Sequence, residues 1–266
     1  MRFSVEHGAF WYHPTGRHVL EDICFDFDCK GVLAILGRNG AGKTTLLKSM
    51  LGLQRWTHGH TLIDGVDIAQ IPVRRLWSRI GYVPQARSTN FALTCEETVL
   101  LGRSARMGLF SRPGRADHTA AQDAMAAVGV EHLAGKLTSE ISGGELQLVL
   151  IARALAVDPE LIILDEPESN LDFRNQLRVL QVLKHLTQTR GLGAIINTHF
   201  PAHALEIARM ALVLMRDGTT RFGMAQEILT EEILSDSFGV GVRILPVDLP
   251  ERPGYACVAA YERTNV

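Results

Sequence analysis

A buried strand, a glycine-rich turn and a helix follow one another early in the chain. The apolar run Val32–Leu36 lies between two glycines, and a run without polar residues is typical of a strand buried on both faces. After Lys43, apolar residues recur at helical spacing, at Leu46, Leu47, Met50 and Leu51. The stretch therefore predicts a strand that enters a helix, Lys43–Leu53, through a short flexible turn.

The alternation of strands and helices continues along the chain. We expect strands at Phe3–His7, Val19–Phe27, Arg79–Val83, Leu161–Leu164, Ala194–Asn197 and Ala211–Met215. Helical periodicity marks Glu96–Gly102, Asp117–Val128, Glu145–Ala156 and a segment that Asp172 caps and Gly191 ends. This order predicts an α/β protein with a mostly parallel sheet and a helical insert from about Thr94 to Asp158. The tail, Gly241–Val266, predicts either a short β-hairpin or a loose end.

Composition excludes several classes of protein. Hydrophobic residues make up 46% of the 266 residues and charged residues 21%, which excludes a disordered chain. The longest apolar runs are strand-sized, whereas a membrane-spanning helix needs roughly 20 apolar residues. The scattered cysteines at 24, 29, 95 and 257 argue against a disulfide framework or a zinc site and favour a reduced cytosolic setting. The net charge of −2 argues against a nucleic-acid partner.

The turn before the helix has the sequence of a phosphate-binding loop. Residues 37–44 match the P-loop pattern G-x-x-x-x-G-K-[ST] in the strand-to-helix context that the pattern requires. Gly40 and Gly42 let backbone N–H groups face inward, where they and the helix N-terminus attract phosphate oxygens. We expect Lys43 to contact the β- and γ-phosphates and Thr44 to place its hydroxyl on Mg²⁺. A glycine-rich turn without a ligand is the alternative.

A second buried strand ends in two carboxylates. Asp165 and Glu166 directly follow the apolar run Leu161–Leu164. A carboxylate at the C-terminal end of a parallel strand beside a P-loop can hold Mg²⁺, a role that fits Asp165. Glu166 lies one residue further along and can polarise an attacking water molecule. A solvated acidic pair at a strand end is the alternative.

Four further motifs follow in an order that one family shows. Gln85 comes after Tyr-Val-Pro, Ser142-Gly-Gly-Glu145 precedes a helix, Asp172 caps another helix, and His199 follows a strand. Each alone has an ordinary explanation, such as a surface turn or a helix cap. Together with the P-loop and the acidic pair, they make the chain resemble the nucleotide-binding subunit of an ATP-binding-cassette (ABC) transporter, over roughly residues 3–239.

The resemblance implies a fold and a set of residue roles. The fold is a P-loop NTPase (RecA-like) core with a mostly parallel sheet, an N-terminal antiparallel β subdomain and a helical insert. It places the ABC ATPase domain at 1–240, with a core of 1–85 and 159–240, a helical subdomain of 86–158 and a tail of 241–266. ATP is bound by Tyr12, Gly37, Arg38, Asn39, Gly40, Ala41, Gly42, Lys43, Thr44 and Thr45. Glu166, His199 and Gln85 are catalytic, and Thr44, Gln85 and Asp165 hold Mg²⁺.

The resemblance also implies a homodimer. The signature residues Ser142, Gly143, Gly144 and Glu145 of one copy contact the ATP held by the other, and Asp172 of the D-loop contacts the partner. Tyr12 stacks on adenine, with Trp11 as the alternative. Glu145 replaces the usual Gln of the signature and should be tolerated, whereas Glu168 stands where Thr or Ser is usual and could slow dimer closure.

Two stretches, Thr94–Ser104 and Phe110–Pro113, narrow the resemblance to one group of ATPases. They are similar to the ATPases of binding-protein-dependent importers for metal chelates or oxyanions, which serve iron-siderophore, haem, cobalamin and molybdate. The implied assembly has two permease subunits docking near residues 86–103 and a substrate-binding protein, at the cytoplasmic face of the bacterial inner membrane. The alternatives are a soluble ABC ATPase without a membrane partner, such as an iron–sulfur assembly ATPase, a P-loop kinase and an inactive regulatory cassette.

Overall fold

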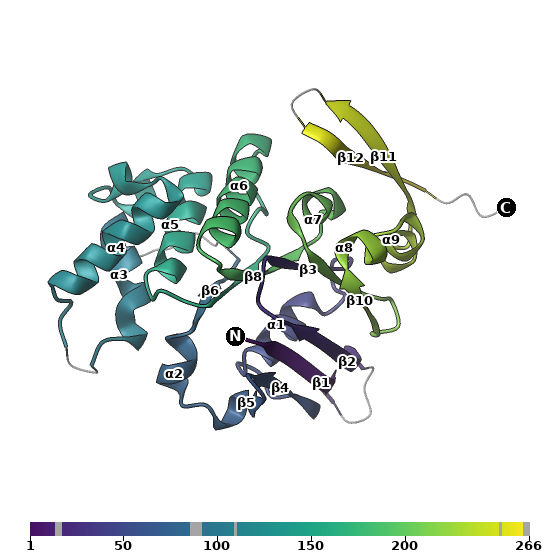
Figure 1. The fold of residues 1–266 in the computed structure, drawn as a ribbon, viewed down its shortest axis with the longest axis horizontal. Helices are drawn as coiled ribbons and strands as arrows, with labels where there is room; N and C mark the ends of the chain where they lie inside the picture. The colour runs from purple at the N-terminus through teal and green to yellow at the C-terminus, as the bar shows by residue number, and fades with distance from the viewer. Residues whose placement is uncertain (14–17, 86–91, 109–110, 250–251, 263–266) are drawn as a thin grey trace. The chain divides into compact units, whose positions relative to one another are not determined.

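The computed structural model describes residues 1–13, 18–85, 92–108, 111–249 and 252–262 (Figure 1). None of the helices in these ranges combines the length and the apolar character needed to cross a bilayer. Contacts divide the chain into two compact units. The first unit contains residues 1–28, 32–69 and 196–266, and the second contains residues 29–31 and 70–195. Residues 86–91, the start of the predicted docking surface, lie outside the described ranges, as does Phe110.

An antiparallel sheet in the order β2-β1-β4-β5 opens the first unit. Its strands are β1 (Phe3–Phe10), β2 (Leu20–Phe27), β4 (His58–Ile63) and β5 (Val66–Asp67). Alternate residues of β2 are buried, as one face of a sheet requires, and the alternation breaks once, at Asp22. The register between β1 and β2 shifts near the same place. The predicted N-terminal antiparallel β subdomain is therefore confirmed.

Within the first unit, the strand that precedes the P-loop belongs to a second group of paired strands. The elements are β3 (Val32–Leu36), α1 (Lys43–Met50), β9 (Met210–Leu214) and β10 (Thr220–Met224). β9 pairs with β3 in parallel and with β10 antiparallel. All five residues of β3 are buried, as the uninterrupted apolar run predicts. The helix α1 ends three residues earlier than predicted, because Leu51 forms its C-cap and Gly52 has a left-handed φ of 68°.

The C-terminal tail is a hairpin, so the first of the two predicted alternatives is correct. The remaining elements of the first unit are α7 (Pro201–Ile207), α8 (Ala225–Ile228), α9 (Glu231–Phe238), β11 (Gly241–Leu249) and β12 (Arg252–Tyr261). Figure 1 draws β11 and β12 as a two-stranded ribbon beyond α9. The Ser235 hydroxyl accepts a hydrogen bond from the N–H of Val242 at 2.9 Å, and Glu231 accepts one from the N–H of Ile244 at 2.8 Å. These two contacts fasten the first strand of the hairpin to α9.

The second unit combines a parallel strand pair with helices. Its strands are β6 (Ile80–Val83) and β7 (Leu161–Asp165), which pair in parallel. Its helices are α2 (Val73–Trp77), α3 (Cys95–Leu100), α4 (Arg115–Val128), α5 (Gly143–Leu155) and α6 (Phe173–Thr189), with 3-10 turns at Leu101–Ala105, Glu131–Leu133 and Thr138–Glu140. A further 3-10 turn, Ile68–Gln70, lies where the chain passes between units, and so does the fully buried strand β8 (Gly193–Thr198).

Side-chain caps fix the starts of three of these helices. Thr94 caps α3, Ser142 caps α5 and Asp172 caps α6, each by accepting a hydrogen bond from the backbone N–H three residues on. The prediction for Asp172 is confirmed. Capping at Ser142 means that α5 begins at Gly143, so the signature glycines form its first turn, and the predicted start at Glu145 is two residues late. The division of the chain into domains at residues 86 and 158 stays a prediction.

Candidate functional site

The P-loop of the first unit surrounds a buried lysine. Gly40 and Gly42 have left-handed φ angles of 77° and 100°, which glycine adopts at little cost. Lys43 is only 5% exposed, and its Nζ donates hydrogen bonds to the carbonyls of Gly37 at 2.9 Å and Arg38 at 3.3 Å. The ammonium group is therefore held inside the turn, where its charge adds to the positive potential of the loop amides.

The first amides of α1 receive no side-chain cap, because Gly42 is the N-cap residue. Uncapped N–H groups and the helix dipole together favour an anion at this end of the helix. Beside the loop lies a hollow of about 150 Å³ whose lining includes two arginines, Arg38 and Arg216. It is lined by His18, Val19, Arg38, Gly40, Ala41, Met215, Arg216 and Gly218. This end of the unit has the charge and the donors that a phosphate chain needs.

Two aromatic residues before the loop differ in their surroundings. Tyr12 is 67% exposed, and its hydroxyl lies 3.4 Å from the hydroxyl of Thr45 in α1. Trp11 instead stacks on His18, with the ring centroids 4.6 Å apart, and tilts against His58. The structure thus places Tyr12 beside the helix that follows the P-loop and with its ring open to solvent, while the ring of Trp11 is covered by two imidazoles.

The second unit holds the carboxylate of Glu166 by two hydrogen bonds. Gln85 donates from its amide to Oε2 at 3.2 Å, and Ser169 donates from its hydroxyl to the same oxygen at 2.9 Å. Glu166 itself has a left-handed φ of 47°, an uncommon conformation for this residue type that is frequent at functional sites. The structure brings together two predicted residues, Gln85 and Glu166, and adds Ser169, which lies three residues after Glu166.

Asp165 closes β7 and is almost completely buried, with 5% exposure. Tyr82 lies on the neighbouring strand β6. Burial and the charge of Asp165 raise the pKa of Tyr82 to about 12, so its hydroxyl stays neutral beside the carboxylate. The sequence pattern gave no role to Tyr82, because the pairing of β6 with β7 is what places the two residues on adjacent strands.

The signature forms a complete capping box. Ser142 accepts a hydrogen bond from the N–H of Glu145 at 3.3 Å, and Glu145 accepts from the N–H and the hydroxyl of Ser142 at 2.8 and 2.7 Å. The hydroxyl and the N–H of Ser142 lower the pKa of Glu145, which keeps this carboxylate ionised. Ser142 and Gly143 are exposed, so the N-terminus of α5 is open to solvent.

The residue Asn175 links the signature to the D-loop within the second unit. Its N–H and its side-chain amide donate to the two carboxylate oxygens of Asp172, each at 2.9 Å. A Cβ on Gly144 would lie 2.3 Å from the side chain of Asn175, so any larger residue at this position in α5 would displace that side chain. Glu168, close to the D-loop in sequence, is fully buried.

In the first unit His199 follows β8 and packs against Phe200, with the ring centroids 4.1 Å apart.

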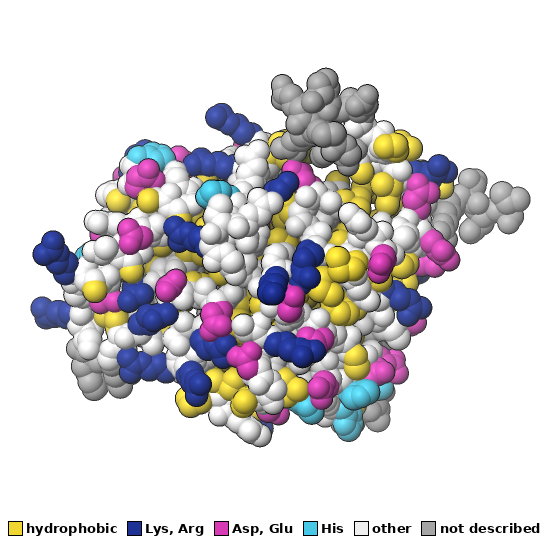
Figure 2. All heavy atoms as spheres, viewed as in Figure 1, with side chains coloured by type: hydrophobic (Ala, Val, Ile, Leu, Met, Phe, Trp, Pro, Cys, Tyr) yellow, Lys and Arg dark blue, Asp and Glu magenta, His cyan; other side chains and the backbone are white. Residues whose placement is uncertain are grey.

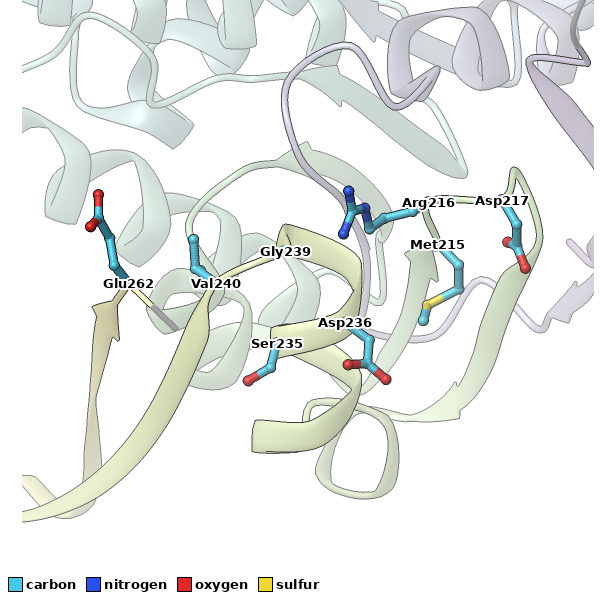
Figure 3. A pocket seen from close by; sticks show the side chains of 8 residues that line it. All are labelled: Met215, Arg216, Asp217, Ser235, Asp236, Gly239, Val240 and Glu262. Carbon is cyan, nitrogen blue, oxygen red and sulfur yellow. The ribbon is translucent and has the colours of Figure 1, made fainter. Parts of the chain in front are cut away.

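A second hollow of the first unit, of about 820 Å³, lies beside the C-terminal hairpin (Figure 3). Figure 3 shows the Arg216 guanidinium turned toward Gly239, while the carboxylates of Asp217, Asp236 and Glu262 point in other directions. Binding sites for small molecules have polar groups that converge on the ligand. These charged groups do not converge, so the geometry favours the P-loop as the site of the first unit.

Comparison with known proteins identifies the family. The ABC transporter family model matches residues 20–169, and the chain belongs to this family. The molybdate import ATP-binding protein MolC of Haemophilus influenzae is 36% identical over 235 residues, which cover 88% of this chain and 87% of that protein. The ferric enterobactin transport ATP-binding protein FepC of Escherichia coli is 31% identical over 227 residues, which cover 85% of this chain and 84% of that protein.

Solved structures agree with the family. A transporter assigned to the metal-chelate type, in an inward-facing conformation, superposes with a TM-score of 0.87 at 33% identity and covers 99% of both chains. The dimeric ABC transporter cassette MJ0796 superposes with a TM-score of 0.72 at 24% identity, covers 84% of this chain and 98% of that one, and supports the fold alone. The predicted P-loop NTPase fold is confirmed. The chain is an ATP-binding and ATP-hydrolysing subunit of the ABC type.

Proposed function

We propose that the chain powers a binding-protein-dependent importer for a metal chelate or an oxyanion. The relatives named for molybdate and ferric enterobactin support this class of cargo, as does the 33% identical metal-chelate type transporter. The observation that carries the catalytic part is the Glu166 carboxylate, which Gln85 and Ser169 hold in one orientation. A fixed carboxylate beside the strand that bears Asp165 can align a water molecule for attack on a phosphoryl group.

In the proposed reaction, one group of residues binds the phosphate chain and another positions the attacking water. The P-loop amides and Lys43 bind the phosphate chain and stabilise the charge that spreads over it in the transition state. Glu166 accepts the proton of the attacking water, and His199 contacts the γ-phosphate. Thr44, Gln85 and Asp165 offer a hydroxyl, an amide oxygen and a carboxylate, an all-oxygen set that suits Mg²⁺. When bound, Mg²⁺ neutralises part of the phosphate charge.

Two copies of the chain assemble for turnover in this proposal. The N-terminus of α5 is capped by Ser142, exposed and free of a bulky side chain at Gly143 and Gly144, so it can approach a phosphate held by another copy. The ionised Glu145 adds a negative charge at that contact. Asp172 reaches the partner from the start of α6, and Tyr12 stacks on the adenine.

The permease subunits dock on an apolar groove of the second unit. The groove has a volume of about 850 Å³, and its lining includes Val73, Trp77, Leu100, Leu101, Met107 and Pro113. Val73 is 71% exposed and Leu101 55% exposed, and a cluster of exposed apolar side chains is typical of an interaction surface. The groove overlaps the described part of the predicted surface, residues 92–103, and extends it to α2 and to Ser104, Ala105, Met107, Gly108, Ser111 and Pro113.

A matched pair of leucines tests this docking. Leu101 lines the groove, and Leu53 lies in the first unit outside it, and both are 55% exposed. Leu101→Glu should release the protein from native membranes and leave the ATPase activity of the purified chain unchanged, whereas Leu53→Glu should stay bound. The ligand of the binding protein that co-purifies with the complex then identifies the cargo. Retention of both variants on the membrane would refute the groove as the docking surface, and recovery of the wild-type protein without an integral-membrane partner would favour the soluble ABC ATPase over the importer.

A further inference from the structure

Three side chains with metal-binding atoms meet on the paired strands β1 and β2. His7 comes from β1, and Asp22 and Cys24 come from β2. The Cys24 Sγ lies 3.7 Å from His7 Nδ1 and 3.7 Å from Asp22 Oδ1, and the last two atoms are 2.8 Å apart. The side chains of His7 and Asp22 are 81% and 69% exposed, so an ion can reach the cluster from solvent. Figure 2 shows histidine and acidic side chains close to one another at the lower right of this face.

A bulge in the strand pair creates the cluster. Val5 pairs with Phe25 and Gly8 with Ile23, so two residues of β1 face the single residue Cys24 of β2. The extra residue, His7, has a left-handed φ of 51°, and Asp22 has one of 49°. These conformations turn both side chains to the same side as the thiol.

The neighbouring strand β4 holds the bulge in place. A Cβ on Gly59 would lie 2.2 Å from the carbonyl oxygen of His7, so the backbone of β4 approaches the bulge as closely as only glycine permits. The position of the His7 backbone is therefore set by a contact outside the cluster. The three side chains project from a braced segment of the sheet, which favours preorganised binding.

The distances in the cluster match one face of a tetrahedral zinc site. With Zn–S of about 2.3 Å and Zn–N or Zn–O of about 2.1 Å, tetrahedral geometry places sulfur about 3.6 Å from each of the other ligand atoms. The two observed sulfur distances are both 3.7 Å. The nitrogen–oxygen distance of 2.8 Å is a hydrogen bond, and it needs to open to about 3.4 Å around an ion. Small side-chain rotations at exposed positions can supply this change.

We propose that His7, Asp22 and Cys24 bind one divalent transition-metal ion, with Zn²⁺ as the best match. A thiolate and an imidazole select borderline-soft ions over Mg²⁺ or Ca²⁺. The N–H of His7 donates to the Cys24 sulfur at 3.3 Å, and such a bond stabilises a thiolate ligand. Water completes the coordination, since the described cluster has three members. The scattered cysteines argued against zinc in the sequence, because the bulge that unites Cys24 with His7 is invisible there.

The test measures binding of Zn²⁺ alone to the full chain in reducing buffer, by calorimetry and by the charge-transfer absorption that Co²⁺ shows on a thiolate. Cys24→Ser, His7→Asn and Asp22→Asn remove one ligand each, and asparagine tolerates the left-handed backbone at the last two positions. Cys257→Ser removes another exposed thiol, and His60→Asn breaks an exposed imidazole–carboxylate pair with Glu6 at 3.4 Å in the same sheet. These two variants are the controls.

We expect one Zn²⁺ per chain, at least tenfold weaker binding in each ligand variant, wild-type binding in both controls, and a Tm that rises by a few degrees with the ion. The Co²⁺ absorption should disappear only in Cys24→Ser. Three outcomes would overturn the proposal. They are wild-type Zn²⁺ affinity in Cys24→Ser, loss of Zn²⁺ affinity in a control variant, and no saturable binding at micromolar Zn²⁺. A variant that misfolds is recognised by its lowered Tm without metal, and the other two ligand variants then decide the result. None of these outcomes depends on the proposed import function.

Discussion

Two capping boxes with the same geometry allow the helical and the nucleotide roles of Ser142 to be separated. Ser142 and Glu145 open α5 with distances of 2.8, 2.7 and 3.3 Å. Thr94 and Glu97 open α3 with the equivalent distances of 2.8, 3.0 and 3.2 Å. Both boxes lie in the second unit, and both end with an acidic residue whose pKa is lowered by the cap. Ser142→Ala and Thr94→Ala therefore remove the same local interaction.

The expected cost in stability is equal for the two variants. Loss of a Ser or Thr N-cap destabilises a helix by about 1 kcal/mol, which corresponds to a fall in Tm of about 2–4 °C for a chain of this size. The pKa of Glu145 is lower in the folded chain than in the unfolded one, so its contribution is present above pH of about 4.3 and is lost as the pH falls through the folded value. The difference between Ser142→Ala and wild type should accordingly shrink in acid.

The two variants should differ in how much ATPase activity they lose. A hydrogen bond to a charged group contributes about 1.5–3 kcal/mol, so a Ser142 hydroxyl that contacts a phosphate of the partner's ATP should be worth roughly 10–150-fold in turnover. Steady-state ATPase assays, well below Tm and at saturating Mg-ATP, should give Thr94→Ala a rate within about twofold of wild type and Ser142→Ala a rate at least about tenfold lower. Equal losses in the two variants would refute the reasoning and leave Ser142 as a helix cap only.

Three further predictions concern the catalytic base, the bulge and the acid response. Glu166→Gln should abolish turnover, retain ATP binding and trap an ATP-bound dimer, measured by ATPase assay and light scattering; turnover near that of wild type would exclude Glu166 as the catalytic base. Gly59→Ala should cost at least about 2 kcal/mol and lower Tm by about 4 °C or more, because its Cβ meets the His7 carbonyl and its φ is 75°. Hydrogen bonds from a backbone amide and from Arg103 lower the pKa of Asp117, so its stabilisation is lost as the pH falls below about 3.9, and Asp117→Asn should flatten the acid decline of Tm.

Features that depend on neighbouring residues in the chain were predictable from the sequence. The fully buried strand β3 and the first four residues of β7 are uninterrupted apolar runs, and the P-loop pattern lies between such a run and a helix. The cap at Asp172 and the Gly-ended helix after it also follow from local chemistry. In each case the hydrogen bonds or the burial involve residues within a few positions of one another.

Features that depend on distant residues were not predictable. The contact of Gln85 with Glu166 spans 81 positions, and the sequence assigned a role to Gln85 only through the family resemblance. The role of Ser169 has a weak local signal, because it lies three residues after Glu166, but a serine at that spacing is common. The raised pKa of Tyr82 depends on the pairing of β6 with β7, and the cluster of His7, Asp22 and Cys24 depends on the pairing of β1 with β2. A reader of the sequence does not see these pairings. Short helices such as α7 and α8 carry too few residues for a periodic pattern.

The division of the chain into units sets an order for biosynthesis. The second unit consists almost wholly of one continuous stretch, residues 70–195, whereas the first unit draws on segments from both ends. β3, the strand before the P-loop, pairs with β9, and about 180 residues separate Leu36 from Leu214, which a ribosome translates in roughly 9–36 seconds. The strand before the P-loop therefore lacks its neighbour β9 while the intervening polypeptide is synthesised, and that polypeptide can already fold. Nascent chains should therefore acquire protease resistance in the middle of the sequence before they can retain a nucleotide.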